Sequence, residues 1–187
     1  VLSGGLVYQD GEPQEGLTVV LDEGVIVGVG KSLRSLKLST DDEGATTSAV
    51  WGGRACEVVQ LDGQHLVPGF VEAQSQVGLV EVGLEGETRN SDAGGSDAIR
   101  AGMVVADAYN PRSTLIAIQR LHGVTSTIIA PSGGLMSGIG GWVDLAGDSQ
   151  REAVVRREVA QFASVKFGDS RAEALLRLRE ALEDGLD

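Results

Sequence analysis

Short apolar runs separated by turn residues dominate the first third of the chain. β-branched residues fill Leu17 to Leu21 and Val25 to Val29, and the Asp22-Glu23-Gly24 triplet between them is a hairpin signal. Further strand patterns occupy Val1-Leu2, Leu6 to Tyr8, and Glu57 to Leu61. Residues 35–54 are rich in Ser, Thr, Asp and Gly and show no sustained apolar period. We therefore predict a small β-sandwich over 1–65 that carries a surface insertion near 35–54.

The pattern changes after Pro68. Leu66 to Val71 is an apolar run typical of a strand that is buried on both faces of a parallel sheet. A helix is predicted next, with Asn110 as its cap, Pro111 in its first turn and Gly123 just beyond its end. Val124 to Ala130 then indicates a buried strand. Strand, helix and strand in this order predict a βαβ unit.

The last third is expected to contain one loop, two short strands and a helix. Pro131 to Gly141 (PSGGLMSGIGG) is glycine-rich and predicts a loop, and strands are expected at Trp142 to Leu145 and at Gln161 to Phe167. A helix is predicted from Arg171 to about Asp184, because Ser170 and Glu173 have the spacing of a capping box. Its expected buried side consists of Leu175, Leu176, Leu178 and Leu182.

Charge and composition exclude several classes of function. The chain has 27 acidic and 15 basic residues, a formal net charge of -12, so its field repels nucleic-acid phosphates. No apolar run approaches the roughly 20 residues of a membrane-spanning helix, so we expect no membrane span. The single cysteine, Cys56, excludes an internal disulfide. Because the chain starts at Val1 instead of Met, we expect a signal or lipoprotein peptide upstream.

Four segments in a fixed order resemble the amidohydrolase superfamily. Leu66 to Gln76 is similar to Val-x-Pro-Gly-Phe-Ile-Asp-x-His-x-His, with which those proteins enter their barrel. Asn110-Pro111, His122 to Ser126, and the loop Gly133 to Gly141 resemble the imidazolonepropionase-related branch. The resemblance covers nearly the whole chain. It implies an α/β chain in which a small β domain precedes the first part of a TIM (β/α)8 barrel over 66–187, incomplete in this chain because a full barrel takes about 250 residues.

The same resemblance implies a metal site that this chain has lost. In the family, two histidines at the end of the first barrel strand bind one metal ion. Gln74 and Gln76 stand at the matching positions, and Glu72 replaces the usual aspartate. A neutral amide oxygen is a poor substitute for imidazole on zinc. We regard Glu72, Gln74 and Gln76 as vestigial metal-site positions and expect no cofactor.

Other residues of the chain are weaker candidates for metal ligands or acid-base groups. His65 lies in a predicted turn, and His122 ends a helix, where a partly positive imidazole suits the helix dipole. The resemblance offers Lys166 as the lysine that bridges metals in some members, but its spacing to Gly168 does not match, and a lysine at a strand end is usually a solvated edge residue. For all three residues the structural interpretation is favoured over a role as a metal ligand. Ser132 with Gly133-Gly134 has the composition of an anion nest, but lacks a basic partner. The polar stretch Glu81 to Ser96 and the nearby Asp97 are interpreted as a solvated acidic loop; its carboxylates are Glu81, Glu85, Glu87, Asp92 and Asp97.

Two functions remain open. The preferred hypothesis is a catalytically degenerate amidohydrolase-like protein that acts as a structural or binding subunit. Its partner would be the rest of its own chain or another protein completing the barrel, including a paralogous amidohydrolase subunit. The alternative is an active hydrolase of amide or cyclic amide bonds, with zinc held by ligands outside this segment. The start at Val1 and the family likeness favour an exported or periplasmic location.

Overall fold

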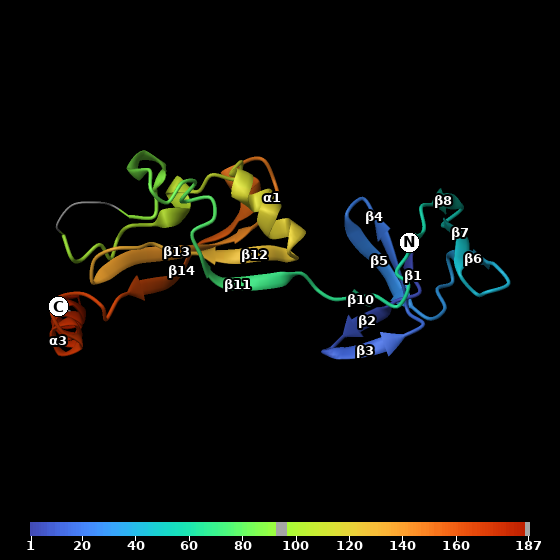
Figure 1. Cartoon of the computed structure of the whole chain (residues 1–187), viewed down its shortest axis with the longest axis horizontal. Helices are drawn as coiled ribbons and strands as arrows, with labels where there is room; N and C mark the ends of the chain where they lie inside the picture. The colour runs from blue at the N-terminus through green and yellow to red at the C-terminus, as the bar shows by residue number, and fades with distance from the viewer. Residues whose placement is uncertain (93–96, 186–187) are drawn as a thin grey trace. The chain divides into compact units, whose positions relative to one another are not determined.

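The computed structural model describes residues 1–92 and 97–185 and divides into two compact units, Val1–Pro68 and Gly69–Asp187 (Figure 1). Strands make up 41% of the structure and helices 18%.

The first unit consists of three small sheets. Its strands are β1 (Leu2–Ser3), β2 (Leu6–Gln9), β3 (Glu12–Glu15), β4 (Thr18–Asp22), β5 (Val25–Gly30), β6 (Leu36–Thr40), β7 (Thr46–Trp51), β8 (Arg54–Cys56), β9 (Val59–Gln60) and β10 (His65–Leu66). The sheet orders are β5-β4-β1-β9, β10-β2-β3 and β6-β7-β8. Two apolar clusters hold them, one around Val7, Leu17 and Val19 and the other around Val20 and Ala49.

Local turn chemistry explains the hairpins of this unit. Glu23 and Gly24 join β4 to β5, and both have positive φ (50° and 80°), as a tight two-residue hairpin turn requires. Residues 35–54, expected as an unstructured surface insertion, instead form the meander β6-β7-β8, in which Ala49 is buried. Strand β3 was not predicted, because its sequence Glu-Pro-Gln-Glu lacks the apolar alternation of a half-buried strand. All four of its residues are exposed.

The second unit is built on one four-stranded sheet. Its elements are β11 (Phe70–Ser75), the 3-10 helices η1 (Gly86–Thr88) and η2 (Val105–Ala108), α1 (Thr114–Leu121), β12 (Val124–Ile129), β13 (Met136–Asp144), α2 (Gln150–Ala153), β14 (Val154–Ala163) and α3 (Arg171–Asp184). The sheet order is β11-β12-β13-β14. Helix α1 lies against the sheet beside β12 (Figure 1). The core contains Leu79, Tyr109, Ile129, Val143 and Leu145.

The predicted start of a TIM barrel is wrong. Strands β11 and β12 are parallel with α1 between them, but β13 runs antiparallel to β12, and β14 antiparallel to β13. The connection from β12 to β13 comprises only Ala130 to Leu135, whereas a parallel crossover needs about a dozen residues or more. The chain therefore turns back along the same sheet, and the alternation of strand and helix that a barrel requires is absent from the described residues.

Part of the glycine-rich segment that was predicted as a loop belongs to an inner strand of this sheet: Pro131 to Leu135 connects β12 to β13, whereas Met136 to Gly141 lies in β13. Met136 to Asp144 is a single strand, and its glycines give neighbouring groups room to approach. A Cβ on Gly140 would lie 2.5 Å from Phe162 Cε2 and 2.7 Å from the Ile129 carbonyl oxygen. The next strand is also displaced from its predicted place, because β14 ends at Ala163 and leaves Lys166 in the following turn.

Both predicted helices are present, but α1 begins at a different residue and α3 does not bury its expected side. Helix α1 begins after Ser113, whose hydroxyl accepts a hydrogen bond from the Leu115 N–H, and Asn110 lies outside it. Gly123 has the left-handed φ of 84° expected after a helix. In α3 the Ser170 hydroxyl accepts a hydrogen bond from the Glu173 N–H, as predicted. Its expected buried side is not formed, since α3 buries only Ala174 among its described residues while Leu175, Leu176 and Leu182 are exposed.

Candidate functional site

The carboxyl ends of β11 and β12 form one edge of the second unit. Because the two strands are parallel, both chains leave the sheet at the same side, which is where α/β proteins commonly bind ligands. The Ala130 N–H donates a hydrogen bond of 2.8 Å to the Ser75 carbonyl and ties the two ends together. We define the carboxyl edge as Gln74 to Gln76 together with Ala130 to Gly134.

The candidate vestigial residues lie along β11 and just beyond it. Glu72 is half-buried, while Gln74 and Gln76 are exposed. The pairing with β12 slips by one residue between Glu72 and Ser75, so simple alternation along the strand does not hold there. The Gln76 carbonyl accepts hydrogen bonds from the N–H groups of Leu79 and Val80, and this turn anchors the backbone at the strand end.

A polar cluster that the sequence did not reveal lies beside these residues. Ser91 is fully buried, its hydroxyl is 2.9 Å from that of Ser132, and its carbonyl accepts a hydrogen bond from the Ser132 N–H. Arg100 forms an ion pair of 2.6 Å with Asp92. A Cβ on Gly133 would lie 2.6 Å from Asp92 Oδ2, so glycine is needed at this contact. Forty-one positions separate the two serines, and although Ser132 adjoins the Gly133-Gly134 pair, no motif links it to Ser91.

The predicted acidic loop is partly tied down by hydrogen bonds. Glu81 accepts hydrogen bonds from Asn110 Nδ2 (3.1 Å) and from the Ser113 hydroxyl (2.8 Å), and so holds the start of α1. Asp97 accepts a hydrogen bond from the Ile99 N–H. Glu85 and Glu87 are at or in η1. Residues 93–96, including Ser96 at the end of the predicted stretch, lie outside the described residues.

The two histidines lie in different units. His122 caps the carboxyl end of α1, and its Nδ1–H donates to the Ile118 carbonyl at 2.8 Å, because a carbonyl oxygen can only accept. His122 is therefore at the start of β12, at the opposite end of that strand from Ala130. His65 stacks on Tyr8, with ring centroids 5.6 Å apart, and its Nδ1 lies 3.2 Å from the tyrosine hydroxyl.

Lys166 follows β14, which runs in the same direction as β12, and so lies at the same edge of the sheet as Ser132. It is exposed, and two strands separate β14 from β11.

These residues do not fit a zinc ion. Tetrahedral zinc takes imidazole, thiolate or carboxylate ligands, and at least three come from the protein. Across residues 1–92 and 97–185 there is no group of three or more His, Cys, Asp or Glu side chains arranged to hold a metal ion. At the carboxyl edge, Gln74 and Gln76 offer only neutral amide groups.

A second polar group, Tyr109, is buried beside the sheet. Its side chain is 1% exposed, and its hydroxyl has no hydrogen-bond partner among the described residues. Burial, with a smaller contribution from the negative charge of Asp144, raises the pKa of Tyr109 to about 12. The Asp144 carboxylate itself accepts a hydrogen bond from the Ser126 hydroxyl at 2.7 Å. The hydroxyl stays neutral at physiological pH and cannot act as a base.

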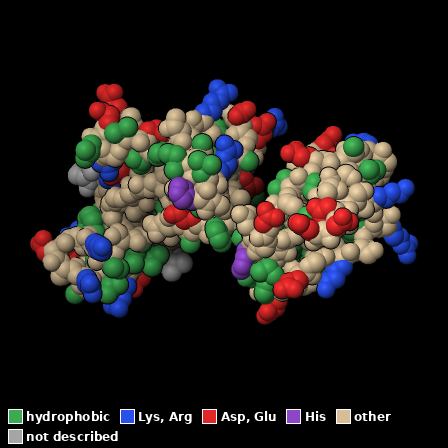
Figure 2. Space-filling view, turned by 45° about the vertical axis from the view of Figure 1, so that its right-hand side comes forward, with side chains coloured by type: hydrophobic (Ala, Val, Ile, Leu, Met, Phe, Trp, Pro, Cys, Tyr) green, Lys and Arg blue, Asp and Glu red, His purple; other side chains and the backbone are tan. Residues whose placement is uncertain are grey.

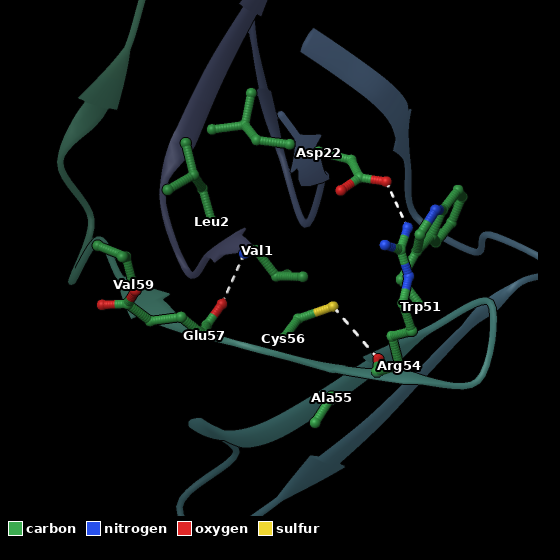
Figure 3. Close-up of a pocket in the computed structure, with 10 residues that line it drawn as sticks. Val1, Leu2, Asp22, Trp51, Arg54, Ala55, Cys56, Glu57 and Val59 are labelled. Atoms are coloured by element: carbon green, nitrogen blue, oxygen red, sulfur yellow. Dashed lines mark hydrogen bonds and ion pairs between the residues drawn. The ribbon is translucent and has the colours of Figure 1, made fainter. Parts of the chain in front are cut away.

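The first unit contains a cavity of about 390 Å³ that is lined by charged, aromatic and thiol groups (Figure 3). In its wall Arg54 Nη2 and Asp22 Oδ2 form an ion pair of 2.6 Å. Cys56 Sγ donates a hydrogen bond of 3.6 Å to the Arg54 carbonyl. Trp51 lies beside the ion pair. The charges of Arg54 and Asp22 neutralise each other, and the hydrogen bond that is found for the thiol joins it to a backbone carbonyl.

The surface charge agrees with the acidic composition. On the face shown in Figure 2, basic side chains are scattered among acidic ones and form no continuous stripe. Within the described part of the chain, no helix has the length and apolar character needed to cross a bilayer.

Comparison with known proteins identifies a fold relationship. No protein-family model and no curated protein matches this chain. Among solved structures, the chain is similar to an amidohydrolase from Thermotoga maritima MSB8, with a TM-score of 0.67 and 22% sequence identity over 95% of this chain. The fold is amidohydrolase-like. The chain spans 41% of the length of that structure, so the likeness concerns the fold of this part alone.

Proposed function

We propose that this protein is a catalytically degenerate amidohydrolase-like protein that acts as a structural or binding subunit. The observation that supports this most is the pair of neutral amides, Gln74 and Gln76, at the carboxyl edge of an amidohydrolase-like fold. In this role its partner is a protein, such as a paralogous subunit that retains the metal ligands.

The physical basis is the chemistry of the ligands. Zinc lowers the pKa of a bound water to near 7 and polarises a carbonyl, and this requires ligands that hold the ion firmly. Neutral amide oxygens bind zinc weakly, and the Ser91–Ser132 hydroxyl pair has no histidine beside it to act as a base. The carboxyl edge therefore offers polar contacts for binding, and its serine pair lacks the imidazole base of a serine hydrolase.

The test is the metal content of the full protein, measured by elemental analysis after exhaustive dialysis. We expect no stoichiometric zinc. The Gln74→His/Gln76→His double variant restores the imidazole pair and should retain more zinc than the parent protein. A matched control, Gln14→His/Gln119→His, adds two histidines in different units and should leave zinc content unchanged.

The opposite result is equally informative. About one zinc ion per chain in the parent protein, together with chelator-sensitive hydrolysis of an amide or cyclic amide, would contradict the degenerate function. It would favour an active hydrolase whose ligands come from outside this segment, which spans 41% of the similar structure.

A further inference from the structure

Strand β5 is an open edge of the sheet β5-β4-β1-β9. It pairs with β4 on one side, and no strand pairs with its other side in the part of the chain that the structure describes. An edge strand presents backbone N–H and C=O groups that are ready to pair with another chain. Soluble proteins normally protect such an edge.

The usual protection is weak at this edge. The sequence of β5, Val-Ile-Val-Gly-Val-Gly, contains no charge and no proline, although its pairing with β4 has one irregularity at Val27. Its side chains are unusually open to solvent for apolar residues: Val25 is 62% exposed, Ile26 61%, Val27 41% and Val29 39%. Leu21 on the neighbouring strand extends the apolar surface, since it is 44% exposed. An unprotected apolar edge of this kind is typical of a surface that another strand covers.

We propose that β5 pairs antiparallel with β5 of a second copy of this chain, across a two-fold axis perpendicular to the sheet. Such an axis places one residue opposite its own copy and thereby restricts the register. The register centred on Val27 sets Val25 opposite Val29 of the other copy and pairs five of the six residues of β5 with one another. The two sheets then form one continuous sheet.

Charge complementarity supports a second copy as the occupant. In this register Glu23, in the turn of the β4–β5 hairpin, and Lys31 of the other copy, which directly follows β5, come to the same end of the paired strands. Both residues are exposed, and neither takes part in an ion pair within the described residues. The two-fold axis produces this acid-base pair twice, once at each end of the paired strands. Opposite charges at facing positions stabilise antiparallel pairs, whereas like charges oppose them.

This dimer does not depend on the proposed function. It involves residues of the first unit only, while the zinc test concerns Gln74 and Gln76 of the second. The two proposals therefore fail or succeed separately.

The test is the oligomeric state of the full chain, measured by sedimentation equilibrium over a range of concentrations. We expect a reversible dimer. Glu23→Lys and Lys31→Glu should each raise the dimer dissociation constant about tenfold, because each reverses two symmetric pairs. The double variant Glu23→Lys/Lys31→Glu restores opposite charges and should recover the parent constant. Val27→Lys places like charges opposite each other on the axis and should abolish the dimer.

Controls separate this interface from general effects of charge. Glu12→Lys on β3 and Lys37→Glu on β6 reverse charges on other exposed strands of the same unit and should leave the dissociation constant unchanged. Far-ultraviolet circular dichroism should show that every variant retains the fold. A monomer at all concentrations, growth beyond a dimer, or a dimer that tolerates Val27→Lys would each overturn the proposal.

Discussion

The hydroxyl of Tyr109 is an unusual group at the scale of single residues. It is buried against the core of the second unit without a hydrogen-bond partner among the described residues, close enough to Asp144 for the negative charge to act on it. A buried polar group without a partner costs about 1–3 kcal/mol. The side chain of Tyr109 belongs to the apolar core cluster of this unit.

Tyr109→Phe tests this cost and its dependence on pH. We expect the variant to be about 1 kcal/mol more stable at pH 7, because an unsatisfied hydroxyl is removed while the ring remains. The folded-state pKa is raised to about 12 from 10.0, so the parent protein loses stability as the pH rises from 10 to 12, where only the unfolded state ionises fully. Tyr109→Phe should lack this loss.

Urea unfolding at pH 7 measures the cost of the buried hydroxyl. Urea unfolding between pH 9 and pH 11.5 measures the alkaline loss of stability, which falls between the unfolded-state pKa of 10.0 and the folded-state pKa of about 12. Tyr8→Phe is the matched control, since Tyr8 is a partly exposed tyrosine of the first unit and its removal leaves the alkaline loss of Tyr109 in place. Equal alkaline losses in the parent protein and in Tyr109→Phe would contradict the assignment.

At the scale of elements, β13 depends on glycine for its contacts with both neighbouring strands. The ring of Phe162 on β14 and the carbonyl of Ile129 on β12 occupy the space that a side chain at Gly140 would need. Glycine normally weakens a strand, but here it allows close packing, and it is favoured where a backbone or ring approaches closely. The same glycines made this segment look like a loop.

Gly140→Ala should therefore destabilise the protein by about 1–3 kcal/mol, as overpacking of a filled core does. The control is Gly102→Ala, where a Cβ would meet no atom within 4 Å. Thermal and urea unfolding of the two variants give the comparison. A Gly140→Ala variant as stable as Gly102→Ala would mean that β13 is not packed against Phe162.

At the scale of the whole molecule, net charge limits the possible partners. With a formal charge of -12, the chain repels polyanions at every distance within the screening length. We expect binding to duplex DNA or RNA to be weaker than the roughly 10⁻⁴ M limit of non-specific binding at physiological salt. Fluorescence anisotropy with a labelled duplex measures this. A tighter complex that weakens steeply with added salt would contradict it.

Part of this architecture could be predicted from local sequence. The β4–β5 hairpin follows from the turn residues Asp22-Glu23-Gly24, in which Gly24 adopts positive φ at little cost, and the end of α1 follows from Gly123 for the same reason. The capping residue Ser170 follows from an equally local pattern. The parallel βαβ unit is present as predicted, but its first strand is Phe70–Ser75 instead of Leu66 to Val71, and Phe70 and Val71 are exposed instead of buried on both faces. The branch of the resemblance and the roles of Glu72, Gln74 and Gln76 stay predictions.

Tertiary structure decided the remainder. The direction of β13 depends on how far the chain travels between Ile129 and Met136, and the strand character of its glycines depends on neighbours such as Phe162. Ser91 and Ser132 meet only through the fold. Local sequence therefore determined the β4–β5 turn, the Ser170 cap and the end of α1, because these depend on the φ preferences and hydrogen bonds of adjacent residues. Strand direction, the polar cluster and the exposed edge of β5 arise from contacts between distant segments, which only the packed chain defines.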